Sequence, residues 1–314
     1  ASNDGDGASD TLTSIENITG SANADDLTGS AAANTINAGA GADTINATAG
    51  ADIIDGGADS DTIDYSGHGS ATAIDVTLNG GTNATVTVTG DVNDTIRNIE
   101  NVIGTTGADS ITGDSQDNSL SGLAGNDTLI GGAGTDVLDG GAGTDTVDYS
   151  AAAGGVTADL GAGTASNDGD GASDTLTAIE NLIGSANADN LTGSAAANTI
   201  TAGAGNDTLS GGAGIDVLDG GTGTDTVDYS AAAGGVTADL GAGTASNDGD
   251  GASDTLTSIE NITGSANADD LTGSAAANTI NAGAGDDIVR ASGGDDTLNG
   301  GANNDTLTYA GSGF

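Results

Sequence analysis

The chain has 314 residues, a formal net charge of −45, and only two strong cations, Arg97 and Arg290. This charge excludes nucleic acid as a partner, because no cationic surface can replace the counterions of phosphates, and it disfavours anionic membranes. No apolar run approaches the length of a membrane span, so membrane insertion is not expected, and the absence of cysteine excludes disulfides. Position 1 is alanine and no signal-peptide pattern is present, so we expect a mature chain or an excerpt of a longer protein.

A high charge with few aromatic residues ordinarily predicts disorder, because too little apolar surface can be buried to offset chain entropy. The aromatic residues are Tyr65, Tyr149, Tyr229, Tyr309 and Phe314. The regular spacing of the aliphatic residues argues against permanent disorder. It predicts conditional order, in which the chain is unfolded without cations and folded with them.

Long repeats divide the chain into blocks. Residues 1–41 are identical to residues 245–285, and residues 143–164 are identical to residues 223–244. Together with a recurring Ile-Glu-Asn tripeptide, these repeats predict four tandem blocks joined by connectors of strand and loop. The predicted blocks are residues 1–84, 85–164, 165–244 and 245–314.

A nine-residue period runs inside each block. In the second block the aliphatic position falls at Val102, Ile111, Leu120, Leu129, Leu138 and Val147. Two residues before each aliphatic stands an acid or, in every third coil, an asparagine. The best-preserved copies read G-G-x-G-x-D-x-U-x, where U is aliphatic, at residues 131–148 and 211–228. This period is the signature of a calcium-binding parallel β-helix.

The spacing of the acids explains why such a chain needs a cation. Stacked strands lie about 4.8 Å apart, so in a coil of two nonapeptides the acids of successive coils lie close together. Two carboxylates at such a distance repel each other by about 1 kcal/mol in water and by more in a protein. Calcium suits this ladder, because it takes roughly six to eight oxygens from both carboxylates and main-chain carbonyls. The glycines allow the positive φ that turns those carbonyls inward.

The nonapeptides resemble haemolysin-type calcium-binding repeats, also called RTX repeats, and the connector at residues 155–160 is similar to segments that accompany them. The resemblance spans nearly the whole chain. It implies an all-β fold, a parallel β-roll (a β-helix solenoid) with multiple Ca²⁺ ions in its turns, and type I export from a Gram-negative bacterium. Carried over residue by residue, the implied ligands are Asp25, Asp43, Asp52, Asp61, Asp109, Asp127, Asp136, Asp145, Asp189, Asp207, Asp216, Asp225, Asp269, Asp287, Asp296 and Asp305.

Some features depart from the family pattern or fall outside it. The asparagine coils are expected to be weaker sites, because a neutral amide is a weaker calcium ligand. The acidic loops at residues 3–10, 167–174 and 247–254 form either a second calcium site or a solvated turn. The family's usual C-terminal secretion signal is not evident in residues 306–314. The tyrosine that ends each block is interpreted as a wedge that closes the core, with glycan stacking as the alternative.

No residue pattern indicates catalysis. His68 is the only histidine, in a Gly-His-Gly turn expected at the surface, and the chain has no lysine or cysteine. We therefore expect a secreted structural protein, such as a surface-layer component, filament, matrix protein or adhesin stalk. It is expected to associate with itself head to tail or in a lattice, and a cell-surface or glycan partner is left open. The alternatives are a calcium-folding export module of a larger secreted enzyme or toxin, and an ice-binding β-roll.

Overall fold

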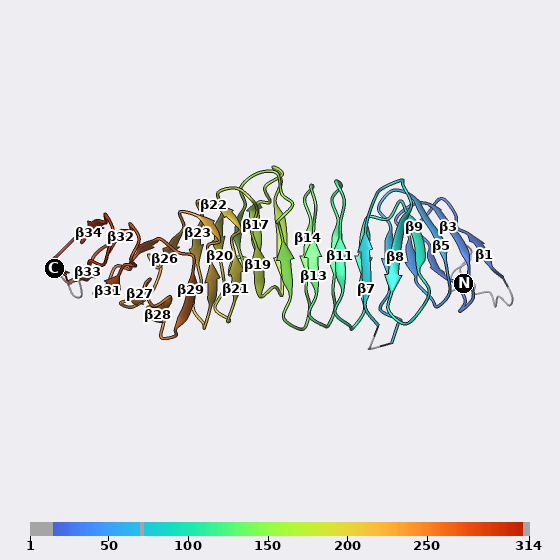
Figure 1. Cartoon of the computed structure of the whole chain (residues 1–314). Coiled ribbons are helices and arrows are strands. Elements are labelled where there is room, and N and C mark those ends of the chain that lie inside the picture. Colours follow the sequence, from blue (N-terminus) through green and yellow to red (C-terminus); the bar gives the residue numbers. More distant parts are fainter. Residues whose placement is uncertain (1–14, 70–71, 310–314) are drawn as a thin grey trace. The chain divides into compact units, whose positions relative to one another are not determined.

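The computed structural model describes residues 15–69 and 72–309 (Figure 1). The regular secondary structure of these residues consists of β-strands alone, which confirms the predicted all-β fold. Most strands contain three residues, because each is built around the single aliphatic residue of one nonapeptide. Within the same residues, no helix could span a membrane.

The strands fall into two compact units, residues 1–147 with 172–179, and residues 148–171 with 180–314. The first unit contains β1 (Asn17–Thr19), β2 (Asp26–Thr28), β3 (Thr35–Ala40), β4 (Thr44–Asn46), β5 (Ile53–Ala58), β6 (Thr62–Asp64), β7 (Ile74–Thr77), β8 (Ala84–Val88), β9 (Asp94–Arg97), β10 (Asn101–Ile103), β11 (Ser110–Thr112), β12 (Ser119–Ser121), β13 (Thr128–Ile130), β14 (Val137–Asp139) and β18 (Asp174–Thr177). Strand β15 (Thr146–Asp148) lies at the boundary in the sequence. The second unit contains β16 (Thr157–Asp159), β17 (Thr164–Asn167), β19 (Asn181–Ile183), β20 (Asn190–Thr192), β21 (Thr199–Thr201), β22 (Ala204–Gly205), β23 (Thr208–Ser210), β24 (Val217–Asp219), β25 (Thr222–Gly223), β26 (Thr226–Asp228), β27 (Thr237–Asp239), β28 (Thr244–Asn247), β29 (Asp254–Thr257), β30 (Asn261–Thr263), β31 (Asp270–Thr272), β32 (Thr279–Asn281), β33 (Ile288–Arg290), β34 (Thr297–Asn299) and β35 (Thr306–Thr308).

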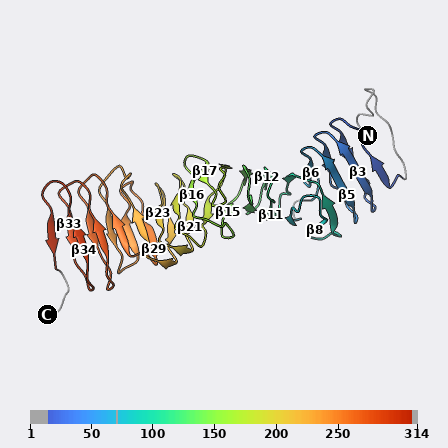
Figure 2. The ribbon, with the colours of Figure 1, turned by 90° about the horizontal axis from the view of Figure 1, so that it is seen from above.

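Each rung of the stack consists of two nonapeptides. Strands pair in parallel across two nonapeptides, so that Ile18 is level with Ile36, and Ile36 with Ile54. The intervening nonapeptide pairs in a second ladder, where Leu27 is level with Ile45. Figure 2 shows β3 and β5 side by side in one such ladder. The predicted parallel β-roll is therefore confirmed, whereas the block boundaries stay a prediction.

The aliphatic residue of most nonapeptides fills the space between the two ladders. Ile45, Ile63, Leu129 and Leu209 are fully buried. Because the side-chain period of a strand is two residues, a slip of one residue would turn these side chains outward. The unbroken nine-residue spacing therefore keeps this thin core continuous within each unit.

The connectors add antiparallel hairpins to the parallel ladders. Strands β7 and β8 pair antiparallel around the Asn-Gly-Gly segment at residues 79–81, and β8 pairs antiparallel with β9. In the second unit β27, β28 and β29 are arranged in the same way. Strands β9 and β29 also pair in parallel with β5 and β24, so the ladder continues through each connector.

The tyrosines that end the blocks differ in burial. Tyr65, Tyr149 and Tyr229 are buried, which confirms the predicted wedge, but Tyr309 is exposed, so the prediction is wrong at that position. The hydroxyl of Tyr229 donates a hydrogen bond to Asp254 Oδ2 at 3.0 Å, a polar contact that the repeat pattern does not reveal.

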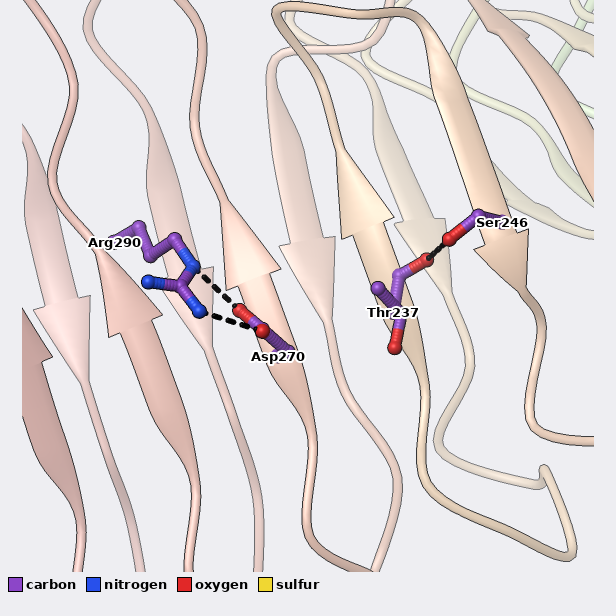
Figure 3. A network of polar contacts seen from close by, with 4 residues as sticks. All are labelled: Thr237, Ser246, Asp270 and Arg290. Atoms are coloured by element: carbon purple, nitrogen blue, oxygen red, sulfur yellow. Dashed lines mark hydrogen bonds and ion pairs between the residues drawn. The ribbon is translucent and has the colours of Figure 1, made fainter. Parts of the chain in front are cut away.

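Both arginines neutralise an outward-facing aspartate on the neighbouring strand. Arg290 donates to both carboxylate oxygens of Asp270, at 2.8 Å and 2.7 Å (Figure 3). Beside them the Ser246 hydroxyl contacts the Thr237 carbonyl across the β27–β28 hairpin. Such solvent-exposed ion pairs contribute little to stability, because water and salt screen the charges, so they do not hold the fold together.

Close stacking of the turns predicts that a side chain at Gly132 destabilises the fold. Its φ is +93°, and a Cβ there would lie 2.1 Å from the Asp114 carbonyl oxygen. Gly90 has a similar φ of +84° but open space around it, so it is a matched control. Both Gly→Ala changes add left-handed strain of about 1–2 kcal/mol. We expect Gly132→Ala to lower the urea midpoint in calcium clearly more than Gly90→Ala, and equal midpoints would contradict the close stacking.

Candidate metal centre

The aspartates two residues before each aliphatic form ladders along the stack. The backbone N–H of Asp109 donates to Asp127 Oδ1 at 2.7 Å, and that of Asp127 donates to Asp145 Oδ1 at 2.8 Å. In the second unit the N–H of Asp207 donates to Asp225 Oδ1 at 2.9 Å. Each Oδ1 is therefore fixed by the backbone of the preceding rung, which aligns the carboxylates in a row.

The structure buries most of the predicted ligands inside the turns. Buried are Asp43, Asp52, Asp61, Asp109, Asp127, Asp136, Asp145, Asp189, Asp207, Asp216, Asp225, Asp269 and Asp287. Asp25 and Asp296 are half-buried and Asp305 is exposed. These three belong to the first or last described rungs, which have a neighbouring rung on only one side. Their role as ligands, like that of the buried set, stays a prediction.

The second carboxylate oxygen, Oδ2, distinguishes the rungs from one another. It is buried without a hydrogen-bond partner in Asp43, Asp61, Asp127, Asp207, Asp216, Asp225 and Asp287. The first glycine of the motif makes room for it, since a Cβ on Gly122 would lie 2.2 Å from Asp127 Oδ2. A buried ionised oxygen without a partner is strongly unfavourable. These rungs therefore fit a hard cation.

A second group of rungs satisfies its carboxylates internally. Asp109 Oδ2 accepts the Thr105 N–H at 2.6 Å, and Asp189 Oδ2 accepts the Ser185 N–H at 2.7 Å. A serine or threonine thus follows the glycine in these turns and caps the acid. Such a rung depends less on a cation than one whose Oδ2 is unpartnered.

The asparagine rungs are neutral and bonded on both sides. Asn118 Nδ2 donates to the Glu100 carbonyl at 2.8 Å, while its Oδ1 accepts the Asp114 N–H at 2.8 Å. The amide supplies the donor that a carboxylate lacks, so no cation is needed to balance it. This arrangement agrees with the expectation of weak sites in the asparagine coils.

Acids in the connectors extend the ladder, and the prediction missed them. Asp94 Oδ1 accepts the Asp52 N–H at 2.9 Å, and Asp254 Oδ1 accepts the Asp216 N–H at 3.1 Å. Both acids precede an aliphatic by two residues, as every ladder acid does. This signal could have found them, but the missing glycines in the connector obscured it.

The acidic connector loops are organised around one inward-facing aspartate. Asp248 Oδ1 accepts the N–H groups of Asp250, Gly251 and Ala252 at 2.8, 2.9 and 3.0 Å. Its Oδ2 is buried without a hydrogen-bond partner. The loop at residues 3–10 lies outside the described residues. Calcium binding by these loops stays a prediction.

Burial raises the pKa of the ladder acids. It raises the pKa of Asp61, Asp127 and Asp207 to about 6, with a further increase from neighbouring ladder carboxylates. Burial raises the pKa of Asp216 to about 7, and the charges of Asp254 and Asp248 add to this shift. The ladder therefore resists ionisation unless positive charge is supplied.

The ladders offer carboxylates singly and not in clusters. In residues 15–69 and 72–309, no group of three or more His, Cys, Asp or Glu side chains is placed to hold a metal ion. A cation would therefore need main-chain carbonyls, which stacked glycine turns bring close together. The carboxylates with an unpartnered Oδ2 and the turn carbonyls would hold Ca²⁺, which would neutralise the ladder.

His68 lies in the surface turn predicted for it and is half-buried there. Its ring centroid lies 5.5 Å from that of Tyr65, and both ring nitrogens are buried without a hydrogen-bond partner. The predicted turn position of His68 is therefore confirmed, and its imidazole is partly covered within that turn. The aromatic contact with the wedge tyrosine explains the partial burial.

A substitution of a ladder aspartate should affect calcium binding, whereas a substitution of an exposed aspartate should not. Asp127→Asn should reduce the calcium stoichiometry by about one ion and raise the calcium concentration needed for folding, because it removes a buried carboxylate. Asp75→Asn, at an exposed site on β7, is the control and should change neither quantity. Calorimetric titration and far-UV circular dichroism measure both. An unchanged stoichiometry in Asp127→Asn would remove this residue from the ligand set.

Acid should partly replace calcium. The folded-state pKa values of about 6 to 7 for Asp61, Asp127, Asp207 and Asp216 lie above the ordinary aspartate value of 3.8. Between the ordinary and the raised pKa values the folded state therefore binds more protons than the unfolded chain. Its free energy of unfolding consequently rises as the pH falls. In EDTA, β structure measured by circular dichroism should increase from pH 8 to pH 5. A decrease over that range would contradict the burial of the ladder.

Comparison with known families gives one result. A family model described as RTX calcium-binding nonapeptide repeat matches residues 19–51, 38–67, 98–128, 112–147, 183–218, 201–232, 263–298 and 272–307. These matches cover more than half of the chain and include the ladder rungs of both units. A comparison with curated proteins gives no match. The resemblance predicted from the sequence is confirmed, and the chain belongs to the RTX family of calcium-binding nonapeptide repeats.

Proposed function

We propose that this chain is a secreted bacterial structural protein that folds on calcium and forms part of an extracellular assembly, such as a surface layer, filament, matrix or adhesin stalk. The identity of residues 1–41 with 245–285, and of 143–164 with 223–244, supports this proposal. Identical segments of this kind present the same lateral surface more than once. Such a surface suits a spacer or lattice, in which length and rigidity matter more than one unique binding site.

The observation that carries the proposal is the row of buried carboxylates with an unpartnered Oδ2. Asp127, Asp207 and Asp225 are examples in the two units. Without a cation each of these groups opposes folding, and with Ca²⁺ each becomes a cross-link between the rungs. A chain built in this way stays unfolded where calcium is scarce and becomes rigid in a calcium-rich exterior.

We also propose that the chain alone is not an enzyme. A wide-open groove of about 900 Å³ in the first unit is lined by polar residues that include Asp26, Thr48, His68 and Asp91. Its openness to water and its lack of a histidine with an oriented partner support a surface depression and not a reaction centre.

Calcium-dependent folding is the test. In EDTA at pH 7.5 the far-UV circular dichroism spectrum should be that of a coil, and millimolar Ca²⁺ should convert it to β structure reversibly. Magnesium at equal concentration is the control and should be much less effective, because it demands a smaller octahedral site. Electron microscopy of the calcium form should then show sheets, filaments or rods. A chain that is already folded in EDTA would overturn the proposal.

A further inference from the structure

Two buried carboxylates have an unpartnered oxygen at the third connector, which joins Tyr229 to β29 and contains β27 and β28 (Figure 1). Asp248 lies in the connector loop, and Asp216 lies immediately before β24; both are 0% exposed. Their Oδ1 atoms are fixed by N–H groups, that of Asp248 within its own loop and that of Asp216 by Asn198 at 2.8 Å. Neither Oδ2 atom has a hydrogen-bond partner.

A third carboxylate, that of Asp254, links these two acids to the ladder. Its Oδ1 accepts the Asp216 N–H at 3.1 Å, and its Oδ2 accepts the Tyr229 hydroxyl at 3.0 Å. Burial, together with the charges of Asp254 and Asp248, raises the pKa of Asp216 to about 7. Burial and the charge of Asp248 likewise raise the pKa of Asp254 to about 6. The three negative charges therefore interact in one region away from water.

No cation of the chain neutralises this region. The only two strong cations, Arg97 and Arg290, form ion pairs with Asp55 and Asp270. The tyrosine hydroxyl supplies the donor for Asp254 alone. An ionised oxygen that is buried without a partner is strongly unfavourable, so the Oδ2 atoms of Asp216 and Asp248 require positive charge from outside the protein.

The first connector, between Tyr65 and β9, meets the ladder in the same way but lacks these two oxygens. Asp94 Oδ1 accepts the Asp52 N–H, and Asp94 Oδ2 accepts the Tyr65 hydroxyl. Asp52 Oδ2, however, accepts the Thr48 hydroxyl at 3.3 Å. Burial raises the pKa of both acids, to about 6 for Asp94, whereas the nearby His68 lowers the pKa of both. In the described residues of this connector no carboxylate oxygen is buried without a partner.

We propose that the third connector binds one Ca²⁺ ion of its own, held by the Oδ2 atoms of Asp248 and Asp216. Calcium takes roughly six to eight oxygens, so main-chain carbonyls and water complete its shell. Two side-chain ligands agree with the absence of clusters of three such residues in the part of the chain that the structure describes. The ion joins the connector loop to the turn before β24, and so fixes the β27–β28 hairpin to the ladder.

This site is not one of the nonapeptide sites. The family matches end at residue 232 and resume at residue 263, so Asp248 and Asp254 lie in neither. The loop also departs from the nonapeptide pattern, because an aspartate stands six residues before the ladder acid. The inference goes beyond the proposed function and rests on it only in requiring a chain that folds with calcium.

A single isosteric substitution tests the site. Asp248→Asn keeps the Oδ1 acceptor for the loop N–H groups but removes the charge. Calorimetric titration of the full chain should find about one Ca²⁺ ion fewer than in the wild type. The matched control is Asp250→Asn, at an exposed acid of the same loop, which should keep the wild-type stoichiometry. An unchanged stoichiometry in Asp248→Asn, or the loss of an ion from both variants, overturns the proposal.

Anomalous scattering locates the ion without any substitution. In crystals of the wild-type chain grown with calcium, a long-wavelength anomalous difference map should show a peak about 2.3–2.6 Å from the Oδ2 atoms of Asp248 and Asp216. The first connector should show no peak shared between Asp52 and a connector residue. A map with peaks in the nonapeptide turns and none beside Asp248 overturns the proposal.

The outcomes distinguish this site from the function on which it rests. Circular dichroism of the titrated samples reports calcium-induced folding. A wild-type chain that does not fold with calcium overturns the proposed function first. A chain that folds with calcium, but binds as many ions after Asp248→Asn as before it, overturns the connector site alone.

Discussion

The aspartate ladder is the interaction on which the rest of this fold depends. One carboxylate oxygen of Asp127 is fixed by the backbone of the preceding rung, and the other is buried with no partner from the protein. The core beside it is one aliphatic residue thick, so apolar burial cannot compensate for a row of desolvated charges. Rung spacing, glycine content and dependence on calcium all follow from this conflict.

Three kinds of nonapeptide differ in how they balance the buried charge of the ladder. In rungs such as that of Asp207 an external cation is required, in the Asp189 rung a serine supplies the missing donor, and in the Asn198 rung the charge is absent. The glycines have a separate task, because turns stacked one rung apart leave no room for side chains. Charge and packing are thus controlled by different positions of the same nonapeptide.

Most of the fold could be predicted from the sequence, because one period specifies both the strand positions and the buried face. Leu129 and Ile45 are buried as their spacing requires. The exceptions arise where tertiary context overrides local pattern. Asp94 and Asp254 extend the ladder because hairpins return the connector to the stack, and Tyr309 is exposed although the same position is buried at Tyr229. Whether an Oδ2 has a partner depends on the residue after the first glycine of the turn, a serine or threonine in the capped cases, and the nine-residue period alone does not specify that residue.

The order of rungs within a block has a consequence for how the chain folds. In both units the serine- or threonine-capped nonapeptide and the asparagine nonapeptide come first, at Asp109 and Asn118 and again at Asp189 and Asn198. The rungs with an unpartnered carboxylate follow them. In a solenoid each rung is stabilised by its neighbours, so the self-sufficient rungs can form at lower calcium and serve as a template for the next. We therefore expect order to begin at these self-sufficient nonapeptides and to spread toward the unpartnered carboxylates that follow them.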